Sequence, residues 1–437
     1  MSEGSATLVR RYGLATAVAI IVGQVIAVGI FLVPAGMARS VGSPAWLLAI
    51  WVIMGVMTLC GAFCYSELAS RFPEAGGTYV YLREAYGDLF AFLFGWIVLL
   101  VLDPGLTAIF AIGLTSYLDR IIAIPTPYQP FVAAFVVVAV AALNIVGARL
   151  GSEIIKVLTV TKVAFLLFIV VFGFLSDKGN SANLAPFFVT PPDVVGAMAG
   201  GLVGAFFSFA GWWELTRIAG EIRDPERNLP RALILGVLIL TVIYISVSGV
   251  FLYLVPTAGI TSDETFAAQV GEVLFGTAGA AVFSAVVIAS VLGSLVAYMM
   301  VSPRLYYAMA RDGLFFRSVA AVHPKFETPY VAIVIQAILA LVLIFSGSFQ
   351  EILSLFFFVV VVFIAATVAS IFVFRRRPDH GGFKAPGYPL SPLIFLVITA
   401  VVLFFIAYEH PERSFIGVGL VILGVPVYYL FRRRRTV

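Results

Sequence analysis

The feature that most constrains this chain is a series of apolar stretches, each of about 20 residues, that recur from end to end. A helix of that length crosses the hydrocarbon core of a bilayer. Apolar residues make up 62% of the chain and charged residues only 11%, so lipid is the solvent that most of these side chains require. The sequence therefore predicts an all-α integral membrane protein, with one transmembrane domain over residues 1–437.

Twelve transmembrane helices are expected from the apolar stretches. Their predicted spans are 14–38, 45–71, 86–119, 129–148, 154–175, 194–219, 229–254, 274–310, 330–346, 349–374, 390–408 and 414–431. The first stretch is followed by further spans and lacks the cleavage pattern of a signal peptide, so we expect it to be retained.

The distribution of Lys and Arg predicts the topology. With a cytoplasmic N-terminus, 22 of these residues fall on the cytoplasmic side and four on the other, with Lys162 inside a span. By the positive-inside rule, this bias predicts a multi-pass protein of the cell (inner) membrane with both termini in the cytoplasm. The net charge of +4 is then a topology signal and does not indicate a nucleic-acid partner.

Two predicted helices contain a segment that favours a break. The first, at Gly23–Gly29 in GQVIAVGIF, and the second, at Ser208–Gly211 in FFSFAGWWEL, are five helices apart. An odd repeat unit would insert the second copy upside down, which predicts inverted repeats over 14–175 and 194–374, with 390–431 outside them. Interrupted helices at corresponding positions of such repeats indicate a substrate site near the bilayer midplane.

The first break is centred on Ile26, Ala27, Val28 and Gly29. Small residues let the backbone leave helical geometry, which frees N–H groups at the positive end of the outer half-helix and favours binding of a carboxylate by main chain. The alternative is that Gly23 and Gly29 merely allow close helix packing, as is common in membranes. The matching break in the second repeat favours the substrate site.

The second break comprises Phe207, Ser208, Phe209, Ala210 and Gly211. Carbonyl groups exposed by unwinding there can accept hydrogen bonds from a substrate ammonium, and the ring of Phe207 would cover the pocket as a gate. The alternative for each aromatic residue is ordinary packing or contact with lipid.

Three ionisable residues are candidates for a role in transport. Lys162 lies halfway along span 154–175, where a charge is costly, and we expect it to donate to the carbonyls freed by the first break; the alternative is a spacing role near the cytoplasmic face. Asp103, before Pro104, is either structural, a proton acceptor or a partner for a cationic substrate side chain. Glu214 leaves the same alternatives open.

Taken together, these motifs resemble the amino acid–polyamine–organocation superfamily, and within it the L-type amino acid transporter branch with its bacterial relatives. The resemblance covers nearly the whole chain. The segments that carry it, besides Lys162, are GQVIAVGIFLVPAGM, ELASRFPEAGGTYVYLREAYG, FSFAGWWELT, GEIRDPERNLPRA, SPRLYYAMARDGLF and HPKFETPYVA. It implies a LeuT-like fold of 5+5 inverted repeats plus two C-terminal helices, with alternating access around a central amino acid site.

The resemblance also assigns roles to residues. It matches Ala27–Gly29 to a carboxylate-binding turn, Phe207 to a gating aromatic, Ser208 and Ala210 to amine-side backbone positions, and Lys162 to a lysine in place of a sodium ion. No metal or cofactor is implied, and sodium coupling is disfavoured. Ala27 and Val28 replace the family's frequent Ser or Gly, and Asp103 also departs from the pattern of the branch.

No disulfide-linked heavy chain is expected as a partner. Animal members of the branch use a cysteine outside the third helix for this bond, and segment Asp119–Tyr128 has none.

The leading hypothesis is an exchanger (antiporter) or facilitator of neutral L-amino acids that works without sodium. The nearest alternative is a proton-coupled permease for cationic amino acids or polyamines. An enzyme is disfavoured because His323, His380 and His410 lie in loops or at a helix edge and no HExxH motif occurs. A receptor or structural protein would not need two interrupted helices and a deep lysine.

Overall fold

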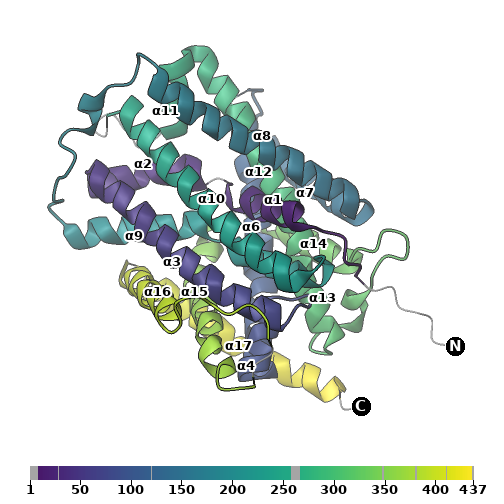
Figure 1. The fold of residues 1–437 in the computed structure, drawn as a ribbon. Coiled ribbons are helices and arrows are strands. Elements are labelled where there is room, and N and C mark those ends of the chain that lie inside the picture. Colours follow the sequence, from purple (N-terminus) through teal and green to yellow (C-terminus); the bar gives the residue numbers. More distant parts are fainter. Residues whose placement is uncertain are drawn as a thin grey trace.

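The architecture is a bundle of helices, seen in a computed structural model (Figure 1). The structure describes residues 8–27, 29–119, 121–256, 266–346, 349–378, 381–409 and 411–435. Three residues named above, Val28, His380 and His410, lie outside these ranges. In the part of the chain that is described, extended pairing is limited to a single parallel bridge between Tyr12 and Ile222. The predicted all-α class is confirmed.

The chain forms its helices in the following order. The first half contains α1 (Leu14–Val25), α2 (Gly29–Val41), α3 (Pro44–Arg71), α4 (Thr78–Tyr86), α5 (Asp88–Ile97), the π-helical turn η1 (Val98–Leu102), α6 (Asp103–Asp119), η2 (Thr126–Tyr128), α7 (Gln129–Val146) and α8 (Ala148–Leu175). The second half contains η3 (Ser181–Leu184), α9 (Val194–Phe209), the 3-10 helix η4 (Trp212–Glu221), α10 (Pro225–Leu254), α11 (Phe266–Phe275), α12 (Thr277–Val301), α13 (Pro303–Arg311), η6 (Arg317–Ala320), α14 (Tyr330–Ser346), α15 (Phe349–Phe374), α16 (Leu390–Glu409) and α17 (Pro411–Arg435).

The outer surface of the bundle is apolar. Among the described residues, ten helical segments are long and apolar enough to cross a membrane, and the apolar helices α1 and α14 are shorter. Their outward faces present large apolar side chains such as Phe135 of α7 and Phe404 of α16, which are 72% and 61% exposed. Exposed apolar surface on so many helices requires lipid, so the chain is a multi-pass membrane protein.

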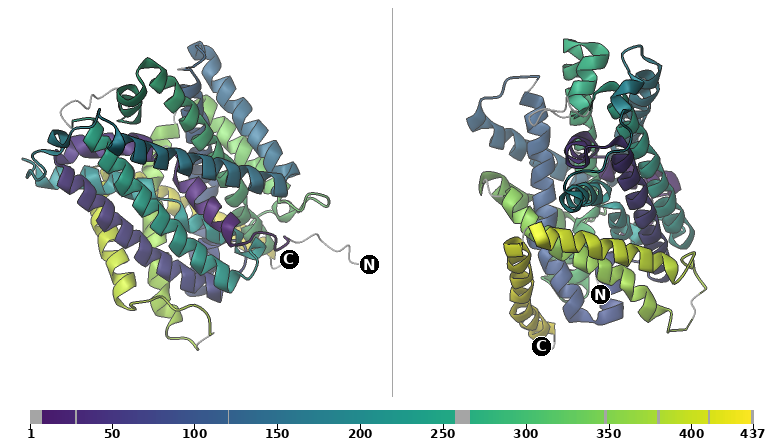
Figure 2. Two further views of the ribbon diagram at one scale, coloured as in Figure 1. Left: turned by 45° about the horizontal axis from the view of Figure 1, so that its top comes forward. Right: turned by 90° about the vertical axis from the view of Figure 1, so that its left-hand side faces the viewer.

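The two interrupted helices lie in the middle of the bundle. Helix α1 packs against α8, α10 and α12, and α2 packs against α9. The long helices α3 and α10 run side by side across the bundle (Figures 1 and 2). The approach of α1 to α8 depends on Gly23, because a Cβ there would lie 2.3 Å from Oγ1 of Thr159. The packing role considered for Gly23 is therefore present.

The last two helices lie on one side of the bundle. Helix α16 packs against α3 and α15, and α17 packs against α5 and α15 (Figure 2). The first and last described residues lie toward the same end of the bundle (Figure 1).

The helical pattern changes one turn before Pro104. The span predicted over 86–119 runs through α5, η1 and α6, and the N–H of Asp103 bonds to the carbonyl of Val98 in the π-helical pattern. Proline has no N–H for the helical ladder and its ring crowds the preceding turn, so a π-turn before Pro104 accommodates it. The helix continues, and Asp103 sits at the start of its second part.

Candidate functional site

Both predicted helix breaks are present in the structure. Helix α1 ends because Ile26 leaves helical geometry, with φ −73° and ψ 77°, and the N–H of Ala27 turns back to the carbonyl of Val25 at 2.8 Å. Helix α9 ends because Ala210 is extended and Gly211 has φ 102°. A side chain at Gly211 would be strained in that conformation, which explains why glycine terminates the helix there.

The two breaks lie against each other. A Cβ added to Gly29 would be 3.1 Å from Cα of Ser208, so the start of α2 approaches the end of α9 at the limit that glycine permits. The hydroxyl of Tyr244, on α10, is 3.2 Å from the carbonyl oxygen of Val25 and 2.9 Å from that of Ser208. Its proton is shared between the last turns of α1 and α9, just before the two breaks, which fixes the separation of these helix ends.

Lys162 on α8 donates to the first break. Its Nζ lies 2.8 Å from the carbonyl oxygens of both Gly23 and Ile26, and 2.9 Å from that of Ser290 on α12. The hydroxyl of Ser294 is a fourth neighbour at 3.1 Å. The predicted contact of Lys162 with the carbonyls of the first break is thus present. Lys162 is 1% exposed, and its ammonium holds α8, α1 and α12 together.

Ser290 and Ser294 complete this arrangement. Their hydroxyls also donate to the carbonyl of Ile26, at 3.1 Å each, and Ser294 reaches that of Gly23 at 2.7 Å. Carbonyl and hydroxyl oxygens arranged in this way are ligands that also suit a small cation. In this structure the positive group that these oxygens surround is the ammonium of Lys162.

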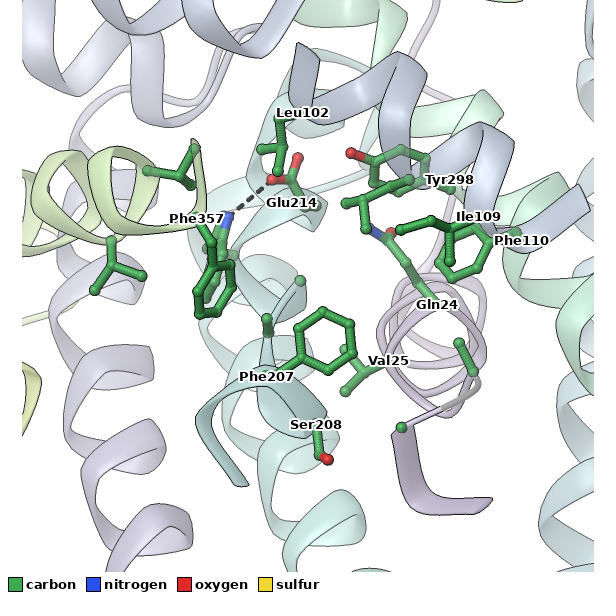
Figure 3. Close-up of a pocket in the computed structure, with 18 residues that line it drawn as sticks. Gln24, Val25, Leu102, Ile109, Phe110, Phe207, Ser208, Glu214, Tyr298 and Phe357 are labelled. Atoms are coloured by element: carbon green, nitrogen blue, oxygen red, sulfur yellow. Dashed lines mark hydrogen bonds between the residues drawn. The ribbon is translucent and has the colours of Figure 1, made fainter. Parts of the chain in front are cut away.

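A cavity of about 90 Å³ lies beside the breaks (Figure 3). A cavity of roughly 10–15 Å³, counted in the same way, holds one water molecule, so this cavity has room for a small organic solute. It is lined by Gln24, Val25, Ala27, Gly29, Leu102, Leu106, Ile109, Phe110, Phe207, Ser208, Ala210, Gly211, Trp213, Glu214, Tyr298, Phe357, Val360 and Val361. Residues of α1, α2, η1, α6, α9, η4, α12 and α15 therefore meet at one mostly apolar space.

The cavity contains most of the predicted binding residues. Ala27, Gly29, Phe207, Ser208, Ala210 and Gly211 line it, and so does Glu214, which was a candidate for a role in transport. Ile26 does not, because its carbonyl faces Lys162. Phe209 does not either, since its ring packs 5.1 Å from that of Tyr244 and 6.0 Å from that of Trp51. Phe209 therefore packs against neighbouring aromatic rings, which was the alternative to a role in substrate binding.

Phe207 stands at the mouth of the cavity. Its side chain is 37% exposed, whereas the other lining residues are buried or half-buried. The ring lies 5.9 Å from that of Phe357 in an edge-on arrangement, so two aromatic rings from α9 and α15 border the opening. A rotation of either ring changes access to the space behind it.

Asp103 belongs to a buried ionic network. Its carboxylate accepts hydrogen bonds from Nη1 of Arg217 at 2.7 Å and from the hydroxyls of Tyr298 and Tyr306 at 2.6 Å and 2.5 Å. Arg217 also pairs with Glu214, through Nη2 at 3.0 Å and through Nε. Asp103 therefore acts at least as a structural tie between α6, η4, α12 and α13.

Arg217 is one of the 22 Lys and Arg residues assigned to the cytoplasmic side from the sequence, near the end of the span predicted over 194–219. The structure buries its side chain, which is 1% exposed and forms ion pairs with Asp103 and Glu214. Burial of a charge is tolerable only with such partners. Arg304, counted in the same way, is likewise buried and binds Glu221 through two nitrogens, at 2.7 Å and 3.2 Å.

The pair of Arg304 and Glu221 belongs to a closed end of the bundle. The segment before α1 crosses there, because the N–H of Tyr12 bonds to the carbonyl of Glu221 at 3.0 Å and the N–H of Arg223 bonds to that of Tyr12 at 2.8 Å. Arg11 adds an ion pair with Glu327 at 2.6 Å. These contacts lie beyond η4, at the far end from the broken tip of α9.

Sequence reasoning missed several residues of the site, notably Gln24, Tyr244, Tyr298 and Arg217. One signal was available: Glu214 and Arg217 are three residues apart, and side chains at that spacing meet on one face of a helix. The others are uncharged residues in apolar helices, and their position is decided by packing.

Comparison with known proteins gives a consistent result. The amino acid permease family matches residues 12–428. The serine/threonine exchanger SteT of Bacillus subtilis is 28% identical over 98% of both chains. The human large neutral amino acids transporter small subunit 2 is 29% identical over 98% of this chain and 81% of its own, and the human cystine/glutamate transporter is 28% identical over 97% and 85%.

The family match covers nearly the entire helical bundle, including both broken helices and the cavity between them. The relatives are transporters and exchangers, and none of those named is an enzyme. The chain therefore belongs to the amino acid permease family, within the amino acid–polyamine–organocation superfamily, and is an amino acid transporter related to the L-type branch.

Proposed function

We propose that this protein moves neutral L-amino acids across the cell membrane by alternating access, without sodium, as an exchanger or facilitator. The observation that carries the proposal is the pairing of two broken helices around one cavity. Midplane sites in transporters of inverted-repeat design are built in this way. One relative, SteT, is named as an exchanger of amino acids, which supports the same function.

The backbone of the breaks would hold the two charged groups common to all amino acids. The N–H groups around Ala27 and Gly29, at the positive end of α2, suit a carboxylate. Carbonyls near Ser208 and Ala210, at the negative end of α9, suit an ammonium. The two ends lie in contact, so one small zwitterion can bridge them.

Sodium independence is supported by Lys162. Its ammonium already donates to the carbonyls of Gly23, Ile26 and Ser290, which are the oxygens that a cation would need. A fixed positive charge there excludes a second cation by repulsion. The tie between α8 and α1 is then permanent, whereas a bound sodium ion would come and go.

A neutral substrate is supported by the lining of the cavity. Leu102, Leu106, Ile109, Phe110 and Val360 supply an apolar wall, on which a charged side chain would lose hydration without gaining a partner. Of the charges nearby, Asp103 and Arg217 are already engaged with each other.

The fold proposal extends the same reasoning. We propose twelve spans in a 5+5 inverted repeat, with α1 and α2 as the two halves of the first helix and α9 and η4 as those of the sixth. Helices α16 and α17 lie outside the repeats. An even number of spans agrees with the position of the first and last described residues toward one end of the bundle (Figure 1). The distribution of positive residues supports a cytoplasmic location for that end.

A disulfide-linked heavy chain is not part of the proposal. Both cysteines of the chain, Cys60 and Cys64, are buried on α3, out of reach of a partner's thiol.

Transport requires the closed end to open. On the proposed topology, the contacts of Glu221 with Arg304 and of the segment around Tyr12 with η4 seal the cytoplasmic end. Phe207, at the mouth of the cavity, would gate the other side. Release into the cytoplasm then involves separation of η4 from α13 while Lys162 keeps α8 attached to α1.

One observation favours a second candidate, a proton-coupled permease for cationic substrates. Glu214 lines the cavity, and together with Asp103 it gives two carboxylates to the single guanidinium of Arg217. The surplus negative charge suits either a proton or a cationic substrate group.

Counterflow into proteoliposomes tests both candidates. Purified protein is reconstituted with a high internal concentration of one amino acid, and uptake of labelled neutral and cationic amino acids is followed at two pH values, in sodium and in choline buffer. We expect neutral amino acids to be taken up equally in both buffers, above protein-free liposomes. Uptake that requires sodium, or uptake of cationic substrates alone with a dependence on pH, would overturn the leading proposal.

A further inference from the structure

The cavity contains one polar side chain whose hydrogen bonds are unused. Gln24, in the last turn of α1, is 4% exposed and lines the cavity. Neither its Oε1 nor its Nε2 has a hydrogen-bond partner among the residues that the structure describes. A buried carboxamide normally finds partners for these groups, because leaving them unpaired is unfavourable.

The amide of Gln24 is directed into the cavity. Figure 3 shows it on the side of Glu214 and Tyr298, across from Phe207 and Phe357. Its Nε2 lies 3.6 Å from the position of a Cβ built on Gly211, so the amide passes close to the second break. The absence of a side chain at Gly211 leaves this space open.

The other polar groups of the cavity are already engaged. The hydroxyl of Tyr298 donates to Asp103, and that of Ser208 donates to the carbonyl of Gly204 at 3.1 Å. Glu214 accepts from Trp213 Nε1 at 2.8 Å and pairs with Arg217. Gln24 therefore offers the cavity a free donor and a free acceptor, and the rest of the wall is largely apolar.

We propose that Gln24 binds the side chain of the substrate, and that the preferred substrates are small neutral amino acids that carry a hydroxyl or carboxamide group. A hydroxyl or carboxamide both donates and accepts hydrogen bonds, as Gln24 does, so it can satisfy the buried amide. An aliphatic side chain of the same size fills the space and leaves the amide unpaired. The inference rests on the proposed function, in which the backbone of the breaks holds the carboxylate and ammonium.

Pairs of nearly isosteric amino acids test this directly. Threonine and valine differ by a hydroxyl in place of a methyl group, and asparagine and leucine differ by a carboxamide in place of a branched methyl end. In the wild-type protein we expect threonine to inhibit uptake of a labelled neutral substrate at about 2- to 12-fold lower concentration than valine, or asparagine to do so relative to leucine, since one hydrogen bond is at stake.

The variant Gln24→Met keeps the length of the side chain and removes both hydrogen-bonding groups. In this variant we expect the two amino acids of a pair that the wild-type protein distinguishes to inhibit at nearly equal concentrations. Valine and leucine should inhibit as well as before or better. The matched control is Gln129→Met, the same substitution in α7, where the amide bonds to the carbonyl of Ile124 outside this cavity. It should retain the wild-type ratios.

Each outcome decides the matter. If the wild-type protein does not distinguish threonine from valine or asparagine from leucine, the inference is overturned, even if the Gln24→Met variant fails to fold. If the Gln24→Met variant still distinguishes them as the wild-type protein does, the inference is overturned as well. In both cases transport of amino acids is intact and the proposed function stands. Failure of the wild-type protein to transport any amino acid would instead reject the proposed function, and the inference with it.

Discussion

The substitution Lys162→Met tests the tie between α8 and the first helix break. Methionine keeps an unbranched stem in the same space and removes the ammonium. The variant loses the hydrogen bonds to the carbonyls of Gly23, Ile26 and Ser290. The carbonyl of Gly23 keeps the hydroxyl of Ser294 as a donor and that of Ile26 keeps the hydroxyl of Ser290, so the break is not left without partners.

The expected effect on stability is modest. A hydrogen bond to a charged group contributes roughly 1.5–3 kcal/mol in net terms. The carbonyls of Gly23 and Ile26 keep serine donors, and the variant no longer buries an ammonium, which is itself unfavourable. We therefore expect a net loss of about a few kcal/mol, within the roughly 5–15 kcal/mol by which proteins are typically stable. The variant should therefore fold.

Transport should suffer far more than folding. Without the ammonium, α1 is free to shift relative to α8, and the backbone N–H groups of the break lose their fixed position. If the shift weakens binding of the substrate and of the transition state by about 1–3 kcal/mol, flux falls roughly 5- to 150-fold. We expect counterflow roughly 5- to 150-fold below wild type, with the same elution profile and a melting temperature within several degrees in detergent.

The matched control is Lys156→Met on the same helix. Lys156 is 33% exposed and pairs with Glu153 at 2.5 Å near the start of α8, so its loss should leave transport unchanged. Wild-type flux in Lys162→Met would refute the reasoning, because the tie would then be dispensable. Equal losses in both variants would attribute the effect to α8 in general.

Three further predictions follow from the site. Phe207→Ala removes the ring at the mouth of the cavity and should slow counterflow or widen the range of accepted substrates; unchanged kinetics across a substrate panel would exclude a gate there. Arg217→Met leaves Asp103 and Glu214 buried without their cation and should destabilise the protein by about 3–5 kcal/mol, whereas Asp103→Asn leaves Glu214 paired and should cost less. Thermal unfolding in detergent compares them, and equal losses would contradict this. Gly211→Ala forces a side chain into φ 102° and should lower both stability and flux; a wild-type melting temperature would show that the break relaxes.

Local sequence was sufficient to locate the helices and their breaks. The span predicted over 330–346 coincides with α14, because hydrophobic length is a property of the segment itself. The breaks at Gly23–Gly29 and Ser208–Gly211 were predictable for the same reason, since glycine and small residues act on their own backbone. The contact of Lys162 with the first break could also be predicted, because a deep ammonium requires acceptors and a break supplies them.

Local sequence was not sufficient for the contacts that close the site. Arg217 and Asp103 are 114 residues apart, and Tyr244 reaches Val25 across 219 residues, so nothing in either segment indicates the other. The ion pairs of Arg217 could not be predicted for this reason: an arginine at the end of a span is normally solvated, and only the fold brings two carboxylates to it.

The sequence by itself thus determined that the chain needs lipid, where its helices break, and that Lys162 must find acceptors, because each of these follows from the chemistry of neighbouring residues. The tertiary structure decided which of the polar residues in those helices face the cavity. Gln24 shows the difference: any position on α1 could have been turned toward a partner helix, and only packing against α8, α10 and α12 turns this amide toward the space beside Gly211.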